Sequence, residues 1–565
     1  MTGRDGHSGP AETVLIGRAI TMSGATEQEE PLAVGMRGGL ISRVVPAAAL
    51  GTLVGESTRV VDVGDRLMVP GFVDPHVHSE VAARTRYLTV DCRAPRCRSI
   101  TDVLDVLTSA LPEARDGWLV GEANLFFDRK LDDGRFPTRQ ELDSVSRSVA
   151  IVLRCGGHLS VLNSRALELA GIDSSYRSVG HSITGLPTVE RDSSGEPTGV
   201  VKEMDNLLPL PGLEPGELQR AIEEGIADLF TRHGVTTLGE ISETVAGLQS
   251  FDAALSSGTL AARMHFYLWV PGTTTLDEAC RHRDWITFAA GRDLARIQGV
   301  KMFSDGGYSA ASAAMKRPYL LPELGPDHHG HVALSRKQLT DALRRTAAAG
   351  LQLAVHANGD RAQEAVCEAF SAVLEDLPSE RPVPRIEHAG NFVPDYAEAT
   401  AAWRRAGIVP CPQPVFIRNF GEFVPDYVGE YARRGQFPFR SLLEDGWPIS
   451  ASSDVWIGSE PGQTNPFLSI ASCVGRFDFH GNPLEPEQAI TVDQALRMHT
   501  LNAAQALGEE GTRGSLEPGK FADIAVLDRD PRTCPADALV DVGVEQVYLG
   551  GRLVHDRAGT ATARS

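Results

Sequence analysis

Apolar and polar residues alternate in short runs over the first 68 positions of the chain. This period-two pattern predicts strands at residues 13–16, 19–22, 32–36, 40–45 and 59–63. Gly38-Gly39, between two of these runs, is typical of a hairpin turn. The pattern returns near the other end, at residues 524–527, 544–549 and 552–554, with a Gly550-Gly551 turn. Because chain termini often lie close together, we expect residues 1–68 and 506–565 to form one small composite β-sandwich domain.

Between these ends, in residues 69–505, apolar runs alternate with amphipathic ones. Candidate strands are residues 235–241, 262–270, 299–303, 351–355, 384–387, 407–410 and 448–452, and candidate helices include residues 216–233, 336–349, 362–374 and 396–406. Such alternation predicts a parallel sheet covered by helices. Counting the strand that ends at His76, eight strands indicate an α/β fold of the (β/α)₈ TIM-barrel type, whose active site would lie at the carboxyl ends of the strands.

Residues from about 90 to 212 interrupt this alternation. They contain Gly156-Gly157-His158 after an apolar strand, a predicted helix at 161–169 and a polar hairpin near 192–196. We interpret this segment as an insertion that caps the barrel mouth.

Composition narrows the choice of partners. The formal net charge of −20, with lysine and arginine scattered along the chain, disfavours a nucleic-acid partner. The eight cysteines contain no Cys-x-x-Cys pair, so neither a disulfide framework nor a zinc ribbon is expected. The first residues do not resemble a signal peptide, and no apolar stretch approaches the ~20 residues of a membrane helix. A cytoplasmic protein without a membrane partner is therefore expected, and a homo-oligomer is left open.

The first candidate chemistry is the pair His76 and His78. Two residues apart on a strand, both imidazoles face the same side and can reach one metal ion. Taken alone, the pair could equally be two exposed loop histidines.

Further ionisable residues support the interpretation that His76 and His78 bind a metal ion. His356, His388 and Asp454 each end a predicted apolar strand. Strand ends are where barrel enzymes place catalytic groups, and a set of imidazoles and carboxylates suits zinc or a similar metal. Packing alone does not explain so many ionisable residues at strand ends.

Five ordered motifs now carry a family resemblance. They are Pro70-Gly-Phe-Val-Asp-Pro-His-Val-His, Gly299-Val-Lys-Met-Phe-Ser-Asp-Gly-Gly, His356-Ala-Asn-Gly-Asp, Arg385-Ile-Glu-His-Ala and Ser452-Ser-Asp. With Leu501-Asn-Ala-Ala and the segment from Gly514 to Asp528, the chain resembles the amidohydrolase superfamily, and within it the amidohydrolase 3 family, over about residues 12–555. The resemblance implies a barrel with a composite β-sandwich, and metal-ligand roles for His76, His78, His356, His388 and Asp454.

The resemblance also raises the question of one metal ion or two. In binuclear members a lysine at the end of the fourth strand carries a CO₂-derived carbamate that bridges the ions. Strand counting makes Lys301 the candidate, with Glu203 of the insertion as a rival ligand. The alternatives are a Lys301 that pairs with Asp305 or is merely exposed, and a site with a single metal.

The expected mechanism is attack by a metal-activated water, with zinc as the expected metal and other divalent metals as alternatives. Asp454 would take the proton of the water and pass it to the leaving nitrogen. His158 is the candidate that stabilises the tetrahedral intermediate, and its alternative is a helix-entry residue. The substrate-contact candidates are Arg154, Asn163, Asp305 and Trp456.

The sequence therefore predicts a metal-dependent hydrolase that cleaves an amide, formamide or related carbon–nitrogen bond of a small molecule. An esterase or isomerase on the same site is one alternative. A non-catalytic regulatory protein is another, although the complete ligand set argues against it.

Overall fold

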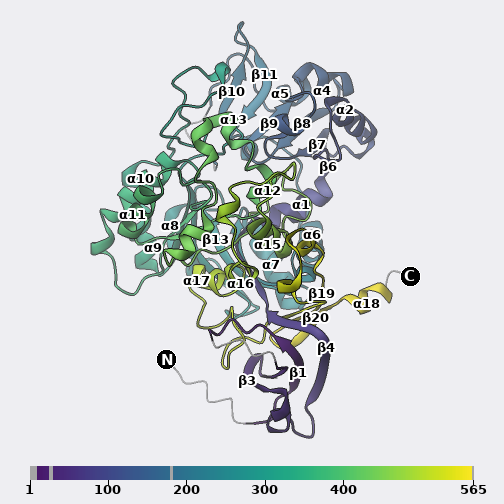
Figure 1. Ribbon diagram of the computed structural model, residues 1–565. Coiled ribbons are helices and arrows are strands. Elements are labelled where there is room, and N and C mark those ends of the chain that lie inside the picture. The colour runs from purple at the N-terminus through teal and green to yellow at the C-terminus, as the bar shows by residue number, and fades with distance from the viewer. Residues whose placement is uncertain (1–8, 25–29, 179–181, 183, 563–565) are drawn as a thin grey trace.

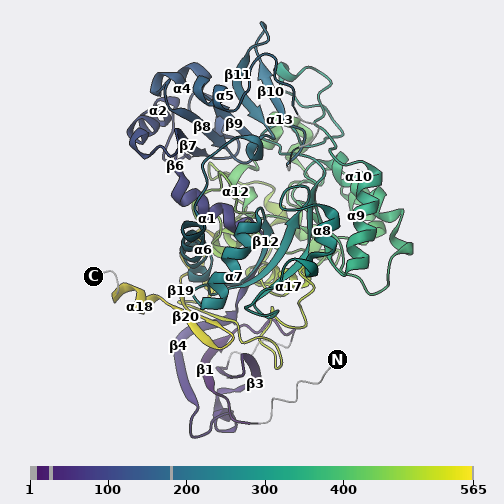
Figure 2. The same cartoon turned by 180° about the vertical axis from the view of Figure 1, so that it is seen from behind.

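The computed structural model describes residues 9–24, 30–178, 182 and 184–562. A central barrel separates two smaller parts, which lie at opposite ends of the molecule (Figures 1 and 2). The first residues, on which the expected absence of a signal peptide rests, lie outside the described residues. Within the described ranges, no helix is long and apolar enough to cross a membrane.

Seven parallel strands form the barrel sheet, in the spatial order β17-β16-β15-β14-β13-β12-β5. They are β5 (Phe72–Val77), β12 (Val235–Ser242), β13 (Arg263–Trp269), β14 (Ala295–Phe303), β15 (Gln352–His356), β16 (Arg385–Glu387) and β17 (Val409–Cys411). Every residue of β12, β13 and β15 is buried, as strands covered on both faces require. The carboxyl ends of all seven strands therefore meet at one rim of the barrel.

Helices return the chain from one strand to the next. They are α1 (Ser79–Leu88), α6 (Pro215–Leu229), α7 (Val245–Ser257), α8 (Leu276–Cys280), α9 (Arg336–Ala349), α10 (Asp360–Ser371) and α11 (Tyr396–Ala406). The bounds of α9 and α11 are those predicted, because a Ser335–Gln338 capping box starts α9 and Gly350 and Gly407, both with positive φ, end the two helices. The expected helix 216–233 ends earlier, at Leu229.

The expected eighth strand, residues 448–452, is not a strand in the structure. The chain that follows it makes two backbone hydrogen bonds with the end of β5, from Asp454 N to His76 O (3.0 Å) and from His78 N to Val455 O (3.0 Å), while Ala451 N donates to Met498 O outside the barrel sheet (3.0 Å). These contacts are too few for a continuous ladder, but they join the segment to β5 at the carboxyl rim of the barrel. The helices α12 (Phe416–Phe420), α13 (Val424–Val428) and α14 (Phe439–Glu444) precede this segment, and α15 (Pro466–Gly475), α16 (Val492–Met498) and α17 (Leu501–Ala506) follow it.

Strands from both ends of the chain form a second seven-stranded sheet, in the order β20-β19-β18-β4-β1-β2-β3. They are β1 (Thr13–Ala19), β2 (Leu32–Arg37), β3 (Leu40–Pro46), β4 (Arg59–Pro70), β18 (Ile524–Leu527), β19 (Val544–Leu549) and β20 (Arg552–Asp556), and helix α18 (Arg557–Thr562) follows. Both predicted Gly-Gly hairpin turns are present, with positive φ at each glycine. The expected strand 19–22 is wrong, because the bulged strand β1 ends at Ala19 and residues 20–22 are not in a strand.

The insertion forms a third sheet, in the order β10-β11-β9-β8-β7-β6. Its strands are β6 (Thr89–Asp91), β7 (Trp118–Ala123), β8 (Ala150–Cys155), β9 (Leu159–Leu162), β10 (Thr188–Arg191) and β11 (Pro197–Lys202), with helices α2 (Ile100–Ser109), α3 (Phe127–Lys130), α4 (Arg139–Val145) and α5 (Ser164–Leu169). The polar hairpin near 192–196 is present, whereas the expected helix 161–169 begins only at Ser164, since residues 161 and 162 belong to β9. Residues of the insertion line the barrel mouth. The predicted fold class, an α/β barrel of the TIM type, is confirmed.

A buried ion pair joins the barrel to the terminal sheet. Arg263 of β13 donates from Nε and Nη2 to Asp523 at 2.7 and 2.9 Å, and its guanidinium lies 3.7 Å from the centre of the Phe521 ring. Arg263 and Asp523 are 4% and 5% exposed. A pair so deeply buried holds the two parts in register, because neither charge tolerates the loss of the other.

We therefore expect Asp523→Ala to lower the free energy of unfolding by about 3–5 kcal/mol, since Arg263 would be left buried and unpaired. Denaturant unfolding followed by tryptophan fluorescence measures the change. The control is Glu444→Ala, which removes the exposed Arg440–Glu444 pair and should have no measurable effect. An equal effect of both substitutions would contradict the proposed role of the Arg263 pair.

Candidate metal centre

His76 and His78 lie at the carboxyl end of β5, and both are buried. Tight packing of β5 against β12 places them there: a Cβ at Gly71 would collide with Thr236, and one at Gly239 would collide with the backbone of Pro75. The two rings are 5.6 Å apart, centre to centre. The alternative of two exposed loop histidines is therefore wrong.

Asp454 completes a three-residue cluster with the two histidines. Its Oδ1 lies 3.3 Å from His76 Nε2 and 3.6 Å from His78 Nε2. One ligand atom from each of the three residues falls within 4.8 Å of the others. Two imidazole nitrogens and a carboxylate oxygen at this spacing are donors that zinc and similar divalent metals take, so these residues fit a metal ion.

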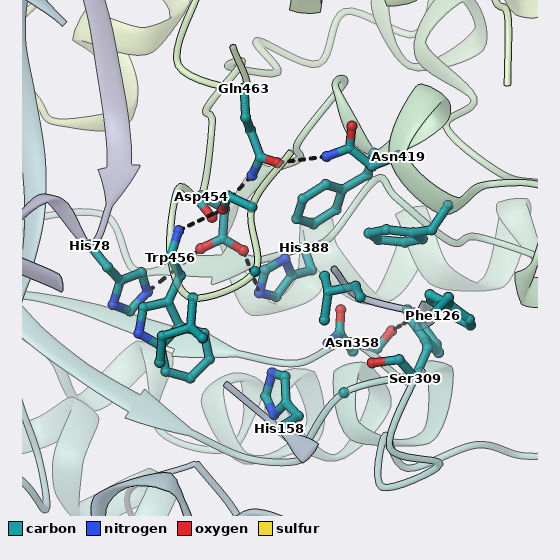
Figure 3. A pocket seen from close by; sticks show the side chains of 18 of the residues that line it. His78, Phe126, His158, Ser309, Asn358, His388, Asn419, Asp454, Trp456 and Gln463 are labelled. Atoms are coloured by element: carbon teal, nitrogen blue, oxygen red, sulfur yellow. Dashed lines mark hydrogen bonds and ion pairs between the residues drawn. The ribbon is translucent and has the colours of Figure 1, made fainter. Parts of the chain in front are cut away.

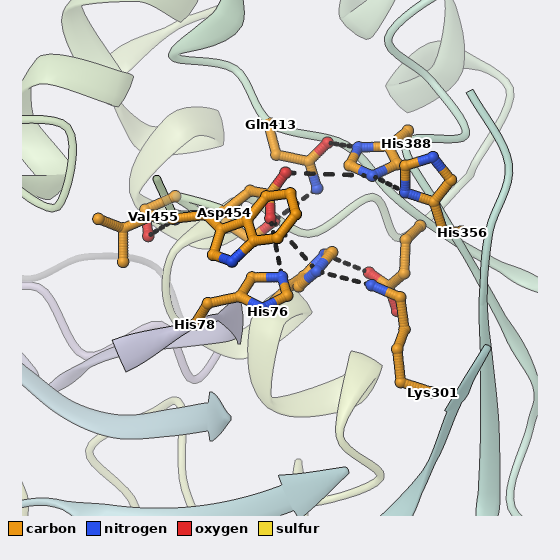
Figure 4. Close-up of polar contacts among 12 residues, drawn as sticks. His76, His78, Lys301, His356, His388, Gln413, Asp454 and Val455 are labelled. Atoms are coloured by element: carbon orange, nitrogen blue, oxygen red, sulfur yellow. Dashed lines mark hydrogen bonds and ion pairs between the residues drawn. The ribbon is translucent and has the colours of Figure 1, made fainter. Parts of the chain in front are cut away.

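His356 and His388 lie beside this cluster, at the ends of β15 and β16 (Figure 4). Their facing nitrogens, His356 Nδ1 and His388 Nε2, are 3.0 Å apart. His388 Nε2 is also 4.0 Å from Asp454 Oδ2. The five residues expected as metal ligands are thus gathered at one buried place, in two groups that share Asp454.

Lys301 of β14 reaches the same centre. Its Nζ lies 3.0 Å from His76 Nε2 and 4.5 Å from the centre of the Phe303 ring, and the residue is fully buried. The alternatives of an exposed Lys301 or of a pair with Asp305 are not what the structure shows. Burial lowers the pKa of Lys301 to about 8, although Glu387 and Asp454 raise it.

Three supporting residues were missed in the sequence. Glu387 Oε2 lies 2.8 Å from His76 Nδ1, and Arg385 Nε donates to Glu387 Oε1 at 2.9 Å. Gln413 Oε1 lies 2.7 Å from His388 Nδ1. The alternation of Arg385 and Glu387 in an otherwise apolar strand is a signal that could have identified the first pair. Gln413 carries no such signal, because it follows β17 in an irregular segment.

Burial sets the charge of the centre. It lowers the pKa values of His78, His356 and His388 well below the usual range, so these imidazoles are neutral and able to bind a metal near pH 7. Burial also raises the pKa of Asp454. Burial opposes ionisation of Glu387 too, but Arg385 and then His76 outweigh it and hold that pKa well below its usual range.

The insertion brings His158 to the centre. His158 Nδ1 lies 2.9 Å from Glu203 Oε2, and Glu203 Oε1 accepts a hydrogen bond from Ser312. Burial opposes the charged form of His158, but Glu203 outweighs burial and raises its pKa. Glu203 therefore binds His158 and is not part of the three-residue metal cluster, so the structure gives no support to Glu203 as the bridging ligand.

Of the four substrate-contact candidates, only Trp456 lines the cavity. Its ring stacks on His78, with centres 5.1 Å apart, and its Nε1 donates to Glu243 at 3.0 Å. Asp305 instead accepts backbone hydrogen bonds from Ala314, Asn358 and Gly359. Its carboxylate thus supports the loop after His356 and has no free face for a substrate.

Arg154 and Asn163, which were also expected to contact the substrate, do not line the cavity either. Arg154 forms a two-pronged ion pair with Asp205, at 2.7 and 2.6 Å. Asn163 caps helix α5 by accepting from Ala166 N, and its amide donates to the carbonyls of Ser146 and Val149. Their polar groups are used within the insertion, by the Asp205 carboxylate for Arg154 and by backbone groups at the start of α5 and in the segment before β8 for Asn163.

The cavity above the centre has an empty volume of about 720 Å³, its open mouth included. Figure 3 shows His78, His158, His388 and Asp454 pointing into it. Lining residues that the sequence did not single out include Leu125, Phe126, Ser309, Asn358, Phe416, Asn419, Phe420, Ile457 and Gln463. They come from loops and from the short helix α12, which carry no periodic signal.

Comparison with known proteins agrees with this geometry. The model of the amidohydrolase family matches residues 59–555. The N-substituted formamide deformylase of Arthrobacter pascens is 30% identical over 552 residues, which cover 94% of this chain and 95% of that protein. The putative amidohydrolase YtcJ of Bacillus subtilis is 25% identical, with 89% and 91% of the two chains covered.

Among solved structures, an uncharacterized metal-dependent hydrolase from Pyrococcus horikoshii is similar with a TM-score of 0.69. It is 22% identical, and 93% of this chain and 99% of that chain are covered, so this likeness bears on the fold alone. The family match covers most of the chain and includes every residue of the centre described above. The chain belongs to the amidohydrolase family and is a metal-dependent hydrolase acting on carbon–nitrogen bonds.

Proposed function

We propose that the protein hydrolyses an amide or formamide bond of a small molecule at the His76–His78–Asp454 centre. The observation that carries the proposal is the convergence of these three residues within 4.8 Å, beside His356 and His388, in the floor of a cavity. The similarity to a protein named N-substituted formamide deformylase supports the formamide as the preferred bond.

Zinc is the proposed metal, since neutral imidazoles and a carboxylate are its usual ligands, although other divalent metals use the same donors. When bound, the metal supplies a water of lowered pKa and polarises the scissile carbonyl. His76, His78 and Asp454 would hold one ion, and His356 and His388 would hold a second or complete the first. Glu387 orients His76 through Nδ1, which leaves Nε2 directed at the centre.

Asp454 is the proposed proton carrier. Its two oxygens reach His76 and His78 on one side and His388 on the other. A carboxylate in this position can accept the proton of the attacking water and return it to the leaving nitrogen. Burial raises the pKa of Asp454, which makes it a stronger base than an exposed aspartate.

His158 is the proposed group that stabilises the negative charge on the carbonyl oxygen. It lines the cavity, and Glu203 fixes its Nδ1 side, so its other ring nitrogen is left for the substrate. Glycine at 307 is required here, because a Cβ would come within 2.7 Å of the His158 ring.

Lys301 is the proposed carbamate residue if two ions bind. It is buried next to His76, and its lowered pKa increases the fraction of neutral amine that CO₂ requires. A single-metal site without carbamate remains the alternative arrangement.

A second candidate function is ester hydrolysis or isomerisation at the same centre, since the same polarised carbonyl serves both reactions. We prefer the amide as substrate because a leaving nitrogen must be protonated, and Asp454 can supply that proton. A leaving alkoxide depends less on protonation. A purely regulatory role is disfavoured by the complete set of buried ligands. The expected partner is thus a small molecule, with no nucleic acid or membrane involved.

The first prediction concerns Asp454. Asp454→Asn should lower kcat on a panel of N-formyl and N-acyl amines by roughly 100- to 10,000-fold, because the proton carrier is lost, while most zinc stays bound. His76→Ala should instead lose both zinc and activity. His499, a buried histidine outside the cluster, provides the control, and His499→Gln should keep its zinc. Zinc is measured by elemental analysis, and full activity of Asp454→Asn would refute the proton-carrier role.

The second prediction concerns Lys301. If it carries a carbamate, protein reconstituted with zinc and ¹³C-bicarbonate should bind two ions per chain and show a carbamate carbon signal by NMR. Lys301→Met should show neither the signal nor the second ion. Two ions bound without a carbamate signal would contradict this assignment, and one ion in both proteins would establish the single-metal alternative.

A further inference from the structure

The cavity has two chemically different sides. One carries the metal centre, with His78, Lys301 and Asp454. The other is an apolar wall, which we define as Leu125, Phe126, Phe416, Phe420 and Ile457. Figure 3 shows His78 and Phe126 on opposite sides of the cavity. Leu125 and Phe126 come from the insertion and Phe416 and Phe420 from α12, so the wall forms only when these two parts meet.

The wall is preformed. Phe126 has a φ of +53°, a conformation that bulky residues rarely adopt. Its ring stacks on Phe420, with centres 5.3 Å apart and an interplanar angle of 29°, and meets the Tyr427 ring edge-on at 4.9 Å. Packing on several sides holds this strained backbone in place, a pattern found at ligand-binding positions.

The charges that line the cavity exclude an anionic substituent. Among the described residues of the lining, the groups that can be cationic are Lys301 of the metal centre and His158, which is already paired with Glu203, and no arginine is present. Glu460 also lines the cavity, but its Oε1 accepts a hydrogen bond of 2.6 Å from Lys130. A carboxylate placed against the wall would be buried without a cation, which is strongly unfavourable.

One hydroxyl of the cavity lining makes no hydrogen bond within the described chain. It is the Oγ of Ser309, a residue that is 6% exposed and is labelled among the lining residues in Figure 3. Asn419, another polar residue of the lining, donates from its amide nitrogen to Gln463 Oε1 at 2.7 Å, whereas its Oδ1 likewise makes no hydrogen bond within the described chain. A buried hydroxyl without a partner destabilises the protein unless a ligand supplies the hydrogen bond.

We infer that the apolar wall binds an uncharged apolar group on the substrate, and that Ser309 hydrogen-bonds the amide group while the wall holds that substituent. This inference rests on the proposed function and narrows it. The substrate class becomes neutral amides with a large apolar substituent, and N-acyl amino acids are excluded.

Three formamides test the wall. N-phenethylformamide carries a phenyl ring, N-ethylformamide lacks the ring, and N-formylphenylalanine adds only a carboxylate. The kcat/KM of N-phenethylformamide should exceed that of N-ethylformamide by roughly 10- to 100-fold and that of N-formylphenylalanine by at least about 100-fold. Phe420→Leu should lower the ratio of kcat/KM for N-phenethylformamide to that for N-ethylformamide. Phe439→Leu changes a buried ring of α14 outside the cavity and should leave the ratio unchanged.

The outcomes separate this inference from the proposed function. Hydrolysis of N-ethylformamide or N-formylphenylalanine at least as fast as N-phenethylformamide overturns the inference alone. If the ratio of kcat/KM for N-phenethylformamide to that for N-ethylformamide is the same in wild type and in Phe420→Leu, the role of the wall is overturned. Hydrolysis of none of the three by zinc-loaded protein overturns the proposed formamide activity, and this inference with it.

Ser309 is tested against a matched serine. Ser469 of α15 also has a buried hydroxyl that makes no hydrogen bond within the described residues, but it does not line the cavity. Ser309→Ala should lower kcat/KM for N-phenethylformamide by roughly 10-fold and raise Tm, because an unpaired buried hydroxyl is removed. Ser469→Ala should raise Tm and leave kcat/KM unchanged. Unchanged kcat/KM in Ser309→Ala, or a lowered Tm, overturns the assignment.

Discussion

Two backbone hydrogen bonds, from Asp454 N to His76 O and from His78 N to Val455 O, hold the metal centre together. They join segments more than 370 residues apart in the sequence, at the one place where the barrel sheet has no regular ladder. Because Asp454 is fixed directly to the strand that carries the two histidines, its carboxylate stays within 3.6 Å of both rings. The remaining candidate ligands are His356 and His388, at the ends of β15 and β16. They lie at the same rim as this group.

Burial then determines the chemistry of that group. His78, His356 and His388 are kept neutral and Asp454 more basic by the same loss of solvent. Glu387 is the exception, because Arg385 pairs with it inside the barrel. The centre therefore combines neutral nitrogen ligands, a basic carboxylate and one carboxylate held ionised, which is the arrangement that a metal and a proton carrier both need.

The insertion turns this centre into a selective site. It supplies His158, the Glu203 that holds it, and Leu125 and Phe126 of the apolar wall. It also fixes the loop after Asp454, since Gly458 N donates to Glu122 and Lys130 pairs with Glu460. In the proposed function, residues at the barrel rim hold the metal, whereas the insertion and α12 together supply the apolar wall.

The sequence alone determined the barrel, the sheet shared by both ends and the five candidate ligand positions, because strand periodicity and an ionisable residue at a strand end are local signals. It also singled out His158, Lys301 and Trp456, which the structure brings to the cavity. Tertiary structure decided the rest. Arg154, Asn163 and Asp305 looked equally available in the sequence, but each forms hydrogen bonds with residues more than ten positions away that folding brings near. Phe126, Phe420 and Ser309 lie in loops and a short helix, where no periodicity shows that they share a cavity, because their proximity depends on how the insertion packs on the barrel.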